Sequence, residues 1–257
     1  MRMNQRVIIS QNLETELAIA LSECEHDSIF VLTDEVTHDL CLPLVKDFFC
    51  LKGAPVITIG STDVHKDLQS LTHVWQALDE GGADRHSCLV NLGGGMVTDL
   101  GGFAASTFKR GIDFINIPTT LLSMVDASVG GKTGINFNGL KNEVGVFNDS
   151  RYVILDTHFL RTLDDQNMRS GYAEMLKHGL ISDEKTWAEL LRFDLGHPDL
   201  PRLQTLVAKS VQVKERVVKL DPHEKGLRKA LNYGHTFGHA FESFSLKHHH
   251  EGEAPIL

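Results

Sequence analysis

The chain has 257 residues, of which 42% are hydrophobic and 23% charged, and these values are typical of a globular protein with one large or two ordinary domains. Its formal net charge of −9 argues against a general binder of nucleic acid or anionic membranes, which would carry a basic surplus. The charge still permits a local cluster of Lys and Arg around an anionic small molecule.

The N-terminal sequence MRMNQRVIIS has no signal-type apolar region, and no stretch approaches the ~20 apolar residues of a membrane span. The cysteines contain no C-x-x-C pair, which predicts reduced thiols rather than a disulfide framework or a cysteine zinc site: Cys24, Cys41, Cys50 and Cys88. We therefore expect a soluble, cytoplasmic protein.

Short apolar runs alternate with helical patterns in the first part of the chain. The runs are rich in Val and Ile, end at Gly, Pro or Asp, and predict buried strands over Ser28–Asp34, Pro55–Gly60, Cys88–Gly95, Asp113–Pro118 and Tyr152–Asp156. Helical segments such as Val64–Glu80 lie between them. This alternation predicts a mostly parallel sheet covered by helices, in a Rossmann-like α/β domain over residues 1–156.

A helical part follows from residue 157 to residue 257. Apolar residues in Arg202–Leu220 recur close to helical spacing, and Ser170–Leu180 and His235–Phe244 also suit helices. No convincing strand is apparent after Asp156. We expect an all-α second domain, with a functional site in the cleft between the two domains.

A glycine-rich turn, NLGGGMVTDLGG (91–102), follows one predicted strand and opens an apparent helix. Glycines let the backbone approach a pyrophosphate closely, and the helix N-terminus offers free N–H groups. The pattern differs from G-x-G-x-x-G, so a dinucleotide site and an ordinary strand-to-helix turn both remain open. Asp34 ends an early strand, where a carboxylate could bind a ribose hydroxyl.

The segment IPTTLLSMVDASVGGKTGINFNGLKNEVG (117–145) is interpreted as a long loop, and long loops in compact domains are often functional. It carries polar residues among glycines, and lysine and asparagine suit phosphate and hydroxyl recognition: Thr119, Thr120, Asp126, Lys132, Asn136, Lys141 and Asn142. An ordinary surface loop could have the same composition.

Two helical motifs complete the candidate chemistry. Glu174 and Lys177 in SGYAEMLKHGL are an i,i+3 pair, which by itself indicates a solvated ion pair. His235 and His239 in YGHTFGHAFE share a helix face, so they could be two zinc ligands, a ligand and a proton carrier, or two core histidines. The H-E-x-x-H protease signature is absent, because Thr236 stands at the glutamate position.

Several long motifs in fixed order resemble 3-dehydroquinate synthase: GGGMVTDLGGFAASTFKRG, IPTTLLSMVDASVGGKTGIN, LKNEVG, SGYAEMLKHG and LNYGHTFGHAFE. The resemblance runs from about Asp34 to Glu242. It implies a Rossmann-like NAD domain followed by a helical metal domain. The implied reaction converts 3-deoxy-D-arabino-heptulosonate 7-phosphate to 3-dehydroquinate and phosphate, with catalytic NAD+ and a divalent metal, usually zinc or cobalt.

The resemblance also implies roles for individual residues. The residues that resemble NAD contacts are Asp34, Asp63 (an aspartate where the family usually has glutamate), Lys66, Gly94, Gly95, Asp99, Thr119, Thr120, Lys141 and Thr162. Those that resemble substrate-site residues are Asp126, Lys132, Asn142, Lys177, Lys214, Arg228, Asn232 and His239. Arg110 is expected to contribute to the phosphate pocket, either of its own chain or of a neighbouring subunit. Glu174 and His235 match metal ligands.

The third metal ligand of the family is a histidine in an H-G-E-A motif, and here the sequence ends SLKHHHEGEAPIL. We take His250 as the candidate, with His248, His249, Glu251 or a residue outside this sequence as alternatives. In the family, the helical domain continues for about another hundred residues beyond this point. We therefore expect the sequence to be incomplete at its C-terminus.

Three other interpretations remain. A related sugar-phosphate cyclase, of the 2-epi-5-epi-valiolone or 2-deoxy-scyllo-inosose synthase type, would share fold and cofactors. A metal-dependent glycerol-type dehydrogenase would not need so many anion-binding lysines. A non-catalytic metal- or NAD-binding remnant is favoured only if the C-terminal differences are real. We expect a small sugar phosphate as the substrate, a homodimer from the resemblance, and neither nucleic acid nor membrane as a partner.

Overall fold

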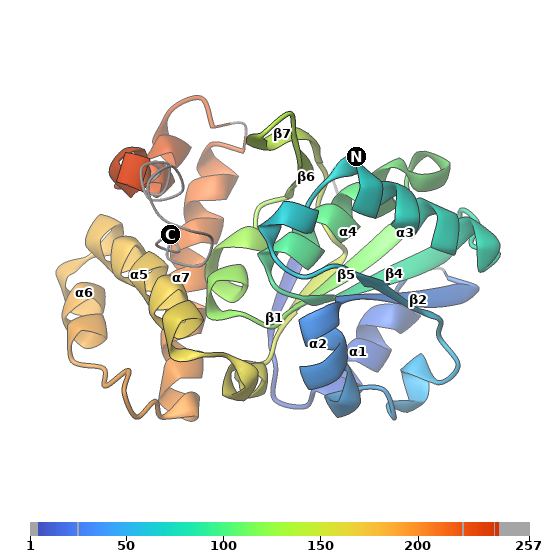
Figure 1. The fold of residues 1–257 in the computed structure, drawn as a ribbon. Helices are drawn as coiled ribbons and strands as arrows, with labels where there is room; N and C mark the ends of the chain where they lie inside the picture. Colours follow the sequence, from blue (N-terminus) through green and yellow to red (C-terminus); the bar gives the residue numbers. More distant parts are fainter. Residues whose placement is uncertain (1–4, 25, 223, 239, 242–257) are drawn as a thin grey trace.

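Six parallel strands form a sheet at the centre of the molecule (Figure 1). The computed structural model describes residues 5–24, 26–222, 224–238 and 240–241. The strand order is β1-β8-β5-β4-β2-β3, with every neighbouring pair parallel. The strands are β1 (Arg6–Ile9), β2 (Ser28–Asp34), β3 (Val56–Ile59), β4 (Ser87–Gly93), β5 (Asp113–Pro118) and β8 (Tyr152–Leu155).

Helices cover both faces of this sheet, because alternate residues of a strand point to opposite sides. On one face, Phe30 and Leu32 of β2 pack with α3 (Leu68–Glu80) and α4 (Gly95–Thr107). On the other face, Val31 packs with α1 (Leu13–Ser22). The short α2 (Glu35–Leu40) follows β2 directly (Figure 1).

The helical part comprises α5 (Asp165–Ser182), α6 (Glu184–Leu191) and α7 (Leu200–Leu220), which lie beside the sheet in Figure 1. Each helix begins at an aspartate whose carboxylate accepts a backbone N–H three residues on: Asp164, Asp183 and Asp199. These caps satisfy N–H groups that lack a partner within the helix. The predicted fold class, a parallel α/β sheet followed by helices, is confirmed.

The apolar core continues from the sheet into the helical part. One cluster of buried residues joins Ile117 of β5 and Met124 of the following turn to Met175 of α5 and Val207 of α7. None of the described helices is both long and apolar enough to cross a membrane. The predicted domain boundary between residues 156 and 157 comes directly after β8. This boundary stays a prediction.

The interpretation of residues 117–145 as a long loop is wrong. Its second half belongs to an antiparallel hairpin of β6 (Lys132–Phe137) and β7 (Leu140–Phe147), which turns at Asn138 and Gly139, both with positive φ. The alternation of Ile135, Phe137, Leu140 and Val144 with polar residues and glycine is short and irregular, so it does not stand out as a strand pattern.

The first half of the same segment forms a π-helical turn, η5 (Ser123–Ala127). The 3₁₀-helical turns are η1 (Leu42–Leu44), η2 (Phe49–Leu51), η3 (Asp63–His65), η4 (Phe108–Arg110), η6 (Thr157–Thr162) and η7 (Leu227–Asn232). A single helical turn with i→i+5 bonds is uncommon and often occurs at functional sites. The segment therefore consists of ordered elements that can hold side chains in place.

Candidate functional site

The glycine-rich turn lies at the carboxyl edge of the sheet. Gly93 ends β4, and Gly94 is the N-cap of α4 without any side-chain cap. A Cβ atom on Gly94 would lie 3.1 Å from Cγ2 of Thr120, and one on Gly95 would lie 3.1 Å from Cβ of Ala127. Larger residues would therefore crowd the start of α4, where free N–H groups favour an anion.

Other predicted NAD contacts gather at this edge, because parallel strands end on the same side. Asp34 ends β2, and its Oδ1 atom accepts the N–H of Thr37 at 2.8 Å, so one oxygen of this carboxylate caps α2. Thr119 follows β5 and donates its N–H to the carbonyl of Gly93 at 3.0 Å. Thr120 donates its hydroxyl to Ser123, 2.9 Å away.

The predicted residue Thr162 makes a local hydrogen bond, from its hydroxyl to the carbonyl of Phe159 at 2.7 Å. Asp63 lies under the hairpin: its carboxylate accepts an N–H of Asn136 at 3.1 Å and lies 3.7 Å from Nζ of Lys141. Lys141 and Asp63 are both predicted NAD contacts, and the structure brings them together.

Lys66 joins the predicted NAD residues to the predicted substrate residues. Its side chain is almost fully buried, and Nζ lies 2.5 Å from Oδ2 of Asp99 on α4 and 2.5 Å from Oδ1 of Asn142 on β7. Burial raises the pKa of the Asp99 carboxyl, and the charge of Lys66 partly offsets this. The hairpin is thereby fixed beside the first turns of α4.

A second buried lysine connects the helical part to the turn η5. Lys214 of α7 contacts the carboxylate of Asp126 and lies 2.6 Å from its backbone oxygen. Burial alone would raise the pKa of Asp126, but the neighbouring Lys214 ammonium outweighs it and lowers that pKa. Arg228, also buried, donates to the carbonyl oxygens of Pro222 at 2.8 Å and Gly130 at 3.2 Å.

Glu224 is a polar residue of the segment before the histidine helix, and the sequence assigns it no role in the site. Its carboxylate contacts Lys132 of the hairpin, and its Oε1 atom lies 2.5 Å from Nδ2 of Asn232. Burial opposes ionisation, yet the bonds from Lys132 and Asn232 leave the pKa of Glu224 below its usual value. Its φ of 55° is rare for a residue other than glycine, and such strain is frequent at functional sites.

Glu174 and His235 meet where the resemblance implies a metal site. Oε2 of Glu174 lies 3.9 Å from Nε2 of His235, and Lys177 contacts Oε1 of Glu174 while lying 3.4 Å from the same imidazole nitrogen. The pair of Glu174 and Lys177 is buried, so it is not the solvated ion pair that the spacing by itself indicates. Burial opposes ionisation of Glu174, but polar contacts with His178 and His235 and the charge of Lys177 lower its pKa strongly.

The donor set fits a divalent metal. A carboxylate and an imidazole are common zinc ligands. Oε1 of Glu174 is buried beside Lys177 and makes no well-aligned hydrogen bond among the described residues. Within the described residues no group of three or more His, Cys, Asp or Glu could hold a metal. The proposed third ligand, His250, and the proton carrier, His239, lie outside the described residues.

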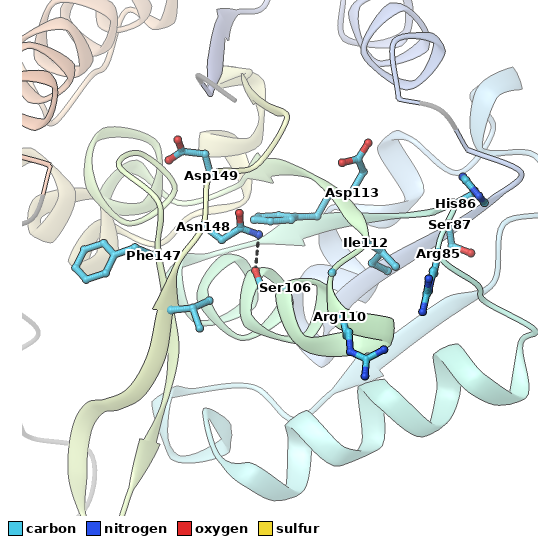
Figure 2. Close-up of a pocket in the computed structure, with 13 residues that line it drawn as sticks. Arg85, His86, Ser87, Ser106, Arg110, Ile112, Asp113, Phe147, Asn148 and Asp149 are labelled. Carbon is cyan, nitrogen blue, oxygen red and sulfur yellow. Dashed lines mark hydrogen bonds between the residues drawn. The ribbon is translucent and has the colours of Figure 1, made fainter. Parts of the chain in front are cut away.

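Arg110 lies apart from all of these residues. It follows α4 and precedes β5, so it occupies the amino edge of the sheet, opposite the glycine turn. There it lines a cavity of about 510 Å³ together with Arg85, His86, Asp113 and Asp149 (Figure 2). Within one chain the structure does not bring Arg110 to the other predicted substrate residues.

Two family models match the chain: the N-terminal part of 3-dehydroquinate synthase matches residues 56–170, and the C-terminal part matches residues 171–255. The 3-dehydroquinate synthase of Parabacteroides distasonis is 55% identical over 242 residues, which cover 94% of this chain and 69% of that protein. This chain belongs to the 3-dehydroquinate synthase family. The predicted family, and with it the predicted enzyme class, is confirmed.

The enzyme of the same name from Sulfurimonas denitrificans is 42% identical and covers 89% of this chain. The chain spans 65% of the length of that relative. A solved 2-deoxy-scyllo-inosose synthase, complexed with carbaglucose-6-phosphate, NAD+ and Co2+, has a TM-score of 0.85 at 27% identity, over 96% of this chain and 70% of that chain. The 2-epi-5-epi-valiolone synthase of Streptomyces hygroscopicus, with NAD+ and Zn2+ bound, has a TM-score of 0.82 at 27% identity, over 99% of this chain and 72% of that chain.

Proposed function

We propose that this chain carries the catalytic centre of a 3-dehydroquinate synthase, which converts 3-deoxy-D-arabino-heptulosonate 7-phosphate to 3-dehydroquinate and phosphate. The observation that carries the proposal is the set of ionic contacts between the glycine turn and Glu174. Lys66, Lys132, Lys177 and Lys214, from four different parts of the chain, each pair with a carboxylate of this region. Lysines suit a substrate with one carboxylate and one phosphate, which can replace a protein carboxylate such as that of Glu224 as their partner.

NAD+ is proposed as the cofactor at the carboxyl edge of the sheet. Gly94 and Gly95 open α4, whose first N–H groups suit the pyrophosphate, and Asp34 keeps one carboxylate oxygen for a ribose hydroxyl. The remaining proposed contacts are Asp63, Lys66, Asp99, Thr119, Thr120, Lys141 and Thr162. The solved relatives that contain NAD+ support this assignment.

A divalent metal, Zn2+ or Co2+, is proposed between Glu174 and His235, with His250 as the third ligand. When bound, the metal would supply Lewis-acid stabilisation of negative charge on a substrate hydroxyl, and NAD+ would supply hydride chemistry. Lys132, Arg228 and Asn232 would bind the substrate anions and hydroxyls, and Glu224 orients Lys132 and Asn232 until the substrate replaces it. His239 is proposed to move protons near neutral pH.

Arg110 is proposed to act across a dimer interface. Its position at the amino edge of the sheet separates it from the other substrate residues of its own chain, so a role at the phosphate requires a second copy. A homodimer is accordingly part of the proposal, as is a cytoplasmic location. Asp126, Asn142, Lys177 and Lys214 complete the proposed substrate site within one chain.

One assay tests the proposed reaction. Purified protein with catalytic NAD+ and Zn2+ should release phosphate from the heptulosonate phosphate. Turnover of sedoheptulose 7-phosphate or glucose 6-phosphate, without release from the heptulosonate phosphate, would identify another sugar-phosphate cyclase. Absence of turnover with all three, despite binding of NAD+ and Zn2+, would identify a non-catalytic relative.

A further inference from the structure

His178 is a fully buried histidine that the proposed reaction leaves without a role. It lies on α5 one turn after Glu174 and faces α7, where its Nδ1 atom is 2.7 Å from the hydroxyl of Ser210. Its second ring nitrogen, Nε2, is 3.2 Å from Oε1 of Glu174. Three side chains from two helices therefore form a line that ends at a proposed metal ligand.

The two neighbours of the His178 ring, Ser210 and Glu174, together select one tautomer of the imidazole. Ser210 is itself buried, so the ring nitrogen of His178 is the partner in reach of its hydroxyl proton. If Ser210 donates to Nδ1, the ring proton must sit on Nε2, where it points at the carboxylate. The opposite tautomer would place a lone pair of Nε2 against the negative oxygen of Glu174.

Ser210 supplies a partner for one of the two ring nitrogens of His178. However, Nε2 of His178 and Oε1 of Glu174 are both buried, and neither makes a well-aligned hydrogen bond within the described residues. Buried polar atoms of this kind are costly unless they have partners. Oε1 of Glu174, which Lys177 also contacts, is the acceptor within reach of Nε2 of His178.

The carboxylate has two oxygens with different neighbours. Oε1 faces His178 and Lys177, whereas Oε2 faces His235 at 3.9 Å. A contact that fixes Oε1 thus determines which oxygen is turned towards the second proposed ligand. Partners that orient a metal ligand in this way commonly affect metal affinity.

We propose that Ser210 and His178 are positioning residues that orient Glu174 for the metal: Ser210 fixes the tautomer of His178, and His178 donates Nε2–H to the carboxylate. This inference rests on the proposed function, because it takes Glu174 as a metal ligand. It adds to that function a buried connection from α7 to the metal site, made through side chains that contact neither substrate nor cofactor.

The test measures the dissociation constant of Zn2+ by competition with a chromophoric chelator, and the binding of NAD+ separately. His178→Leu removes both ring nitrogens and should weaken Zn2+ binding about 10- to 100-fold, as is usual for residues that orient a ligand. Ser210→Ala should weaken it less, since Nε2 remains. His178→Gln, which can place an amide N–H near the position of Nε2, should recover most of the affinity. NAD+ affinity should not change in any of them.

Tyr172→Phe is the matched control. It removes another buried hydrogen bond of α5, from the tyrosine hydroxyl to the carbonyl of Leu190 at 2.6 Å, without touching Glu174. It should lower the melting temperature and leave Zn2+ affinity unchanged. If His178→Leu behaves like this control, or if His178→Gln is no better than His178→Leu, the proposal is wrong. If His178→Leu does not fold, the comparison of Ser210→Ala and His178→Gln with the control decides.

The failure of the proposed function has a different signature. If the unmodified protein and Glu174→Gln bind Zn2+ equally, Glu174 is not a ligand and the metal site itself is misassigned. If Glu174→Gln loses Zn2+ while Ser210→Ala and both His178 variants keep it, the metal site stands and only the positioning role is refuted.

Discussion

Lys214 of α7 and Asp126 of the turn η5 form an ion pair that ties the helical part to the sheet, and the same ammonium lies 2.6 Å from the backbone oxygen of Asp126. The lysine side chain is 7% exposed and that of the aspartate 34%. The lysine is therefore almost completely shielded from water, whereas the aspartate keeps partial access to it. Removal of either partner leaves the other with a charge that water can reach only in part.

Loss of this pair should lower the stability of the fold. Lys214→Met is expected to reduce the free energy of unfolding by about 3 kcal/mol, the lower end for a broken buried pair, because Asp126 keeps some access to water. Urea denaturation measures this change in the free energy of unfolding. Lys209→Met on the same helix removes the more exposed pair with Glu189 and should cost less than about 1 kcal/mol. Equal losses in the two variants would contradict this assignment.

His235 and His239 should behave differently when each is replaced. Glu174→Gln and His235→Ala are expected to lose Zn2+ and activity together, because each removes a proposed ligand. His239→Ala should keep Zn2+ and lose at least about 100-fold in kcat, the usual contribution of a general acid or base. Metal analysis of the dialysed proteins, combined with phosphate release, separates these outcomes. Loss of Zn2+ from His239→Ala would make that residue a ligand instead.

The N-cap of α5, the helix that carries Glu174, predicts a pH dependence of stability. The N–H of Asn167 and its side-chain amide bond to Asp164 and hold the pKa of that carboxyl below its usual 3.8. Because the folded pKa is the lower one, the stabilisation is present above about pH 4 and is lost as the pH falls through the folded pKa.

Asp164→Ala should accordingly cost about 1 kcal/mol near pH 6, as for a typical N-cap, and progressively less below pH 4. Unfolding of metal-free protein in chelator, measured across this range, gives the difference. Asp165→Ala, at the next and more exposed residue, serves as the control and should show a smaller effect. A difference for Asp164→Ala that stays constant down to pH 2 would refute the role of the charged cap.

Gly171 is expected to be essential for the close approach of α5 to the sheet. A Cβ atom there would lie 2.5 Å from the backbone nitrogen of Leu122 and 2.6 Å from Cβ of Leu121. Gly171→Ala should therefore destabilise the protein by about 1–3 kcal/mol, although alanine favours helices. Gly196→Ala is the control: the nearest atom to its Cβ would be Oδ1 of Asp194 at 3.3 Å, on an exposed side chain that can move, so this variant should cost much less in thermal unfolding. Comparable melting temperatures for both variants would show that α5 can move aside.

Much of the α/β fold could be predicted from local patterns. β2 and β5 are continuous apolar runs that end at Asp34 and Pro118, and their observed bounds agree with the prediction. β1 was missed because its four residues RVII form a short, half-exposed edge strand that pairs only with β8. The hairpin β6–β7 was missed because its glycines and polar residues interrupt the alternation.

The candidate site was less predictable, because its contacts join residues distant along the chain. Lys66 and Asn142 are 76 residues apart, and Lys132 and Glu224 are 92 apart. No local pattern indicates that Glu224 bridges Lys132 and Asn232, or that Ser210 faces His178. Family motifs indicated the individual residues, whereas tertiary packing determined their partners. The roles of the selected residues stay predictions.

The apolar cluster shared by β5, η5, α5 and α7 has a mechanical consequence. Independent domains swing about a hinge only when little hydrophobic surface joins them. Here Met124 and Met175 belong to one continuous core, so a rotation of α5 against the sheet would open a void lined by apolar side chains. The proposed cofactor and metal positions are consequently held at a fixed separation by this part of the chain, and access to them must come from motion of elements outside that core.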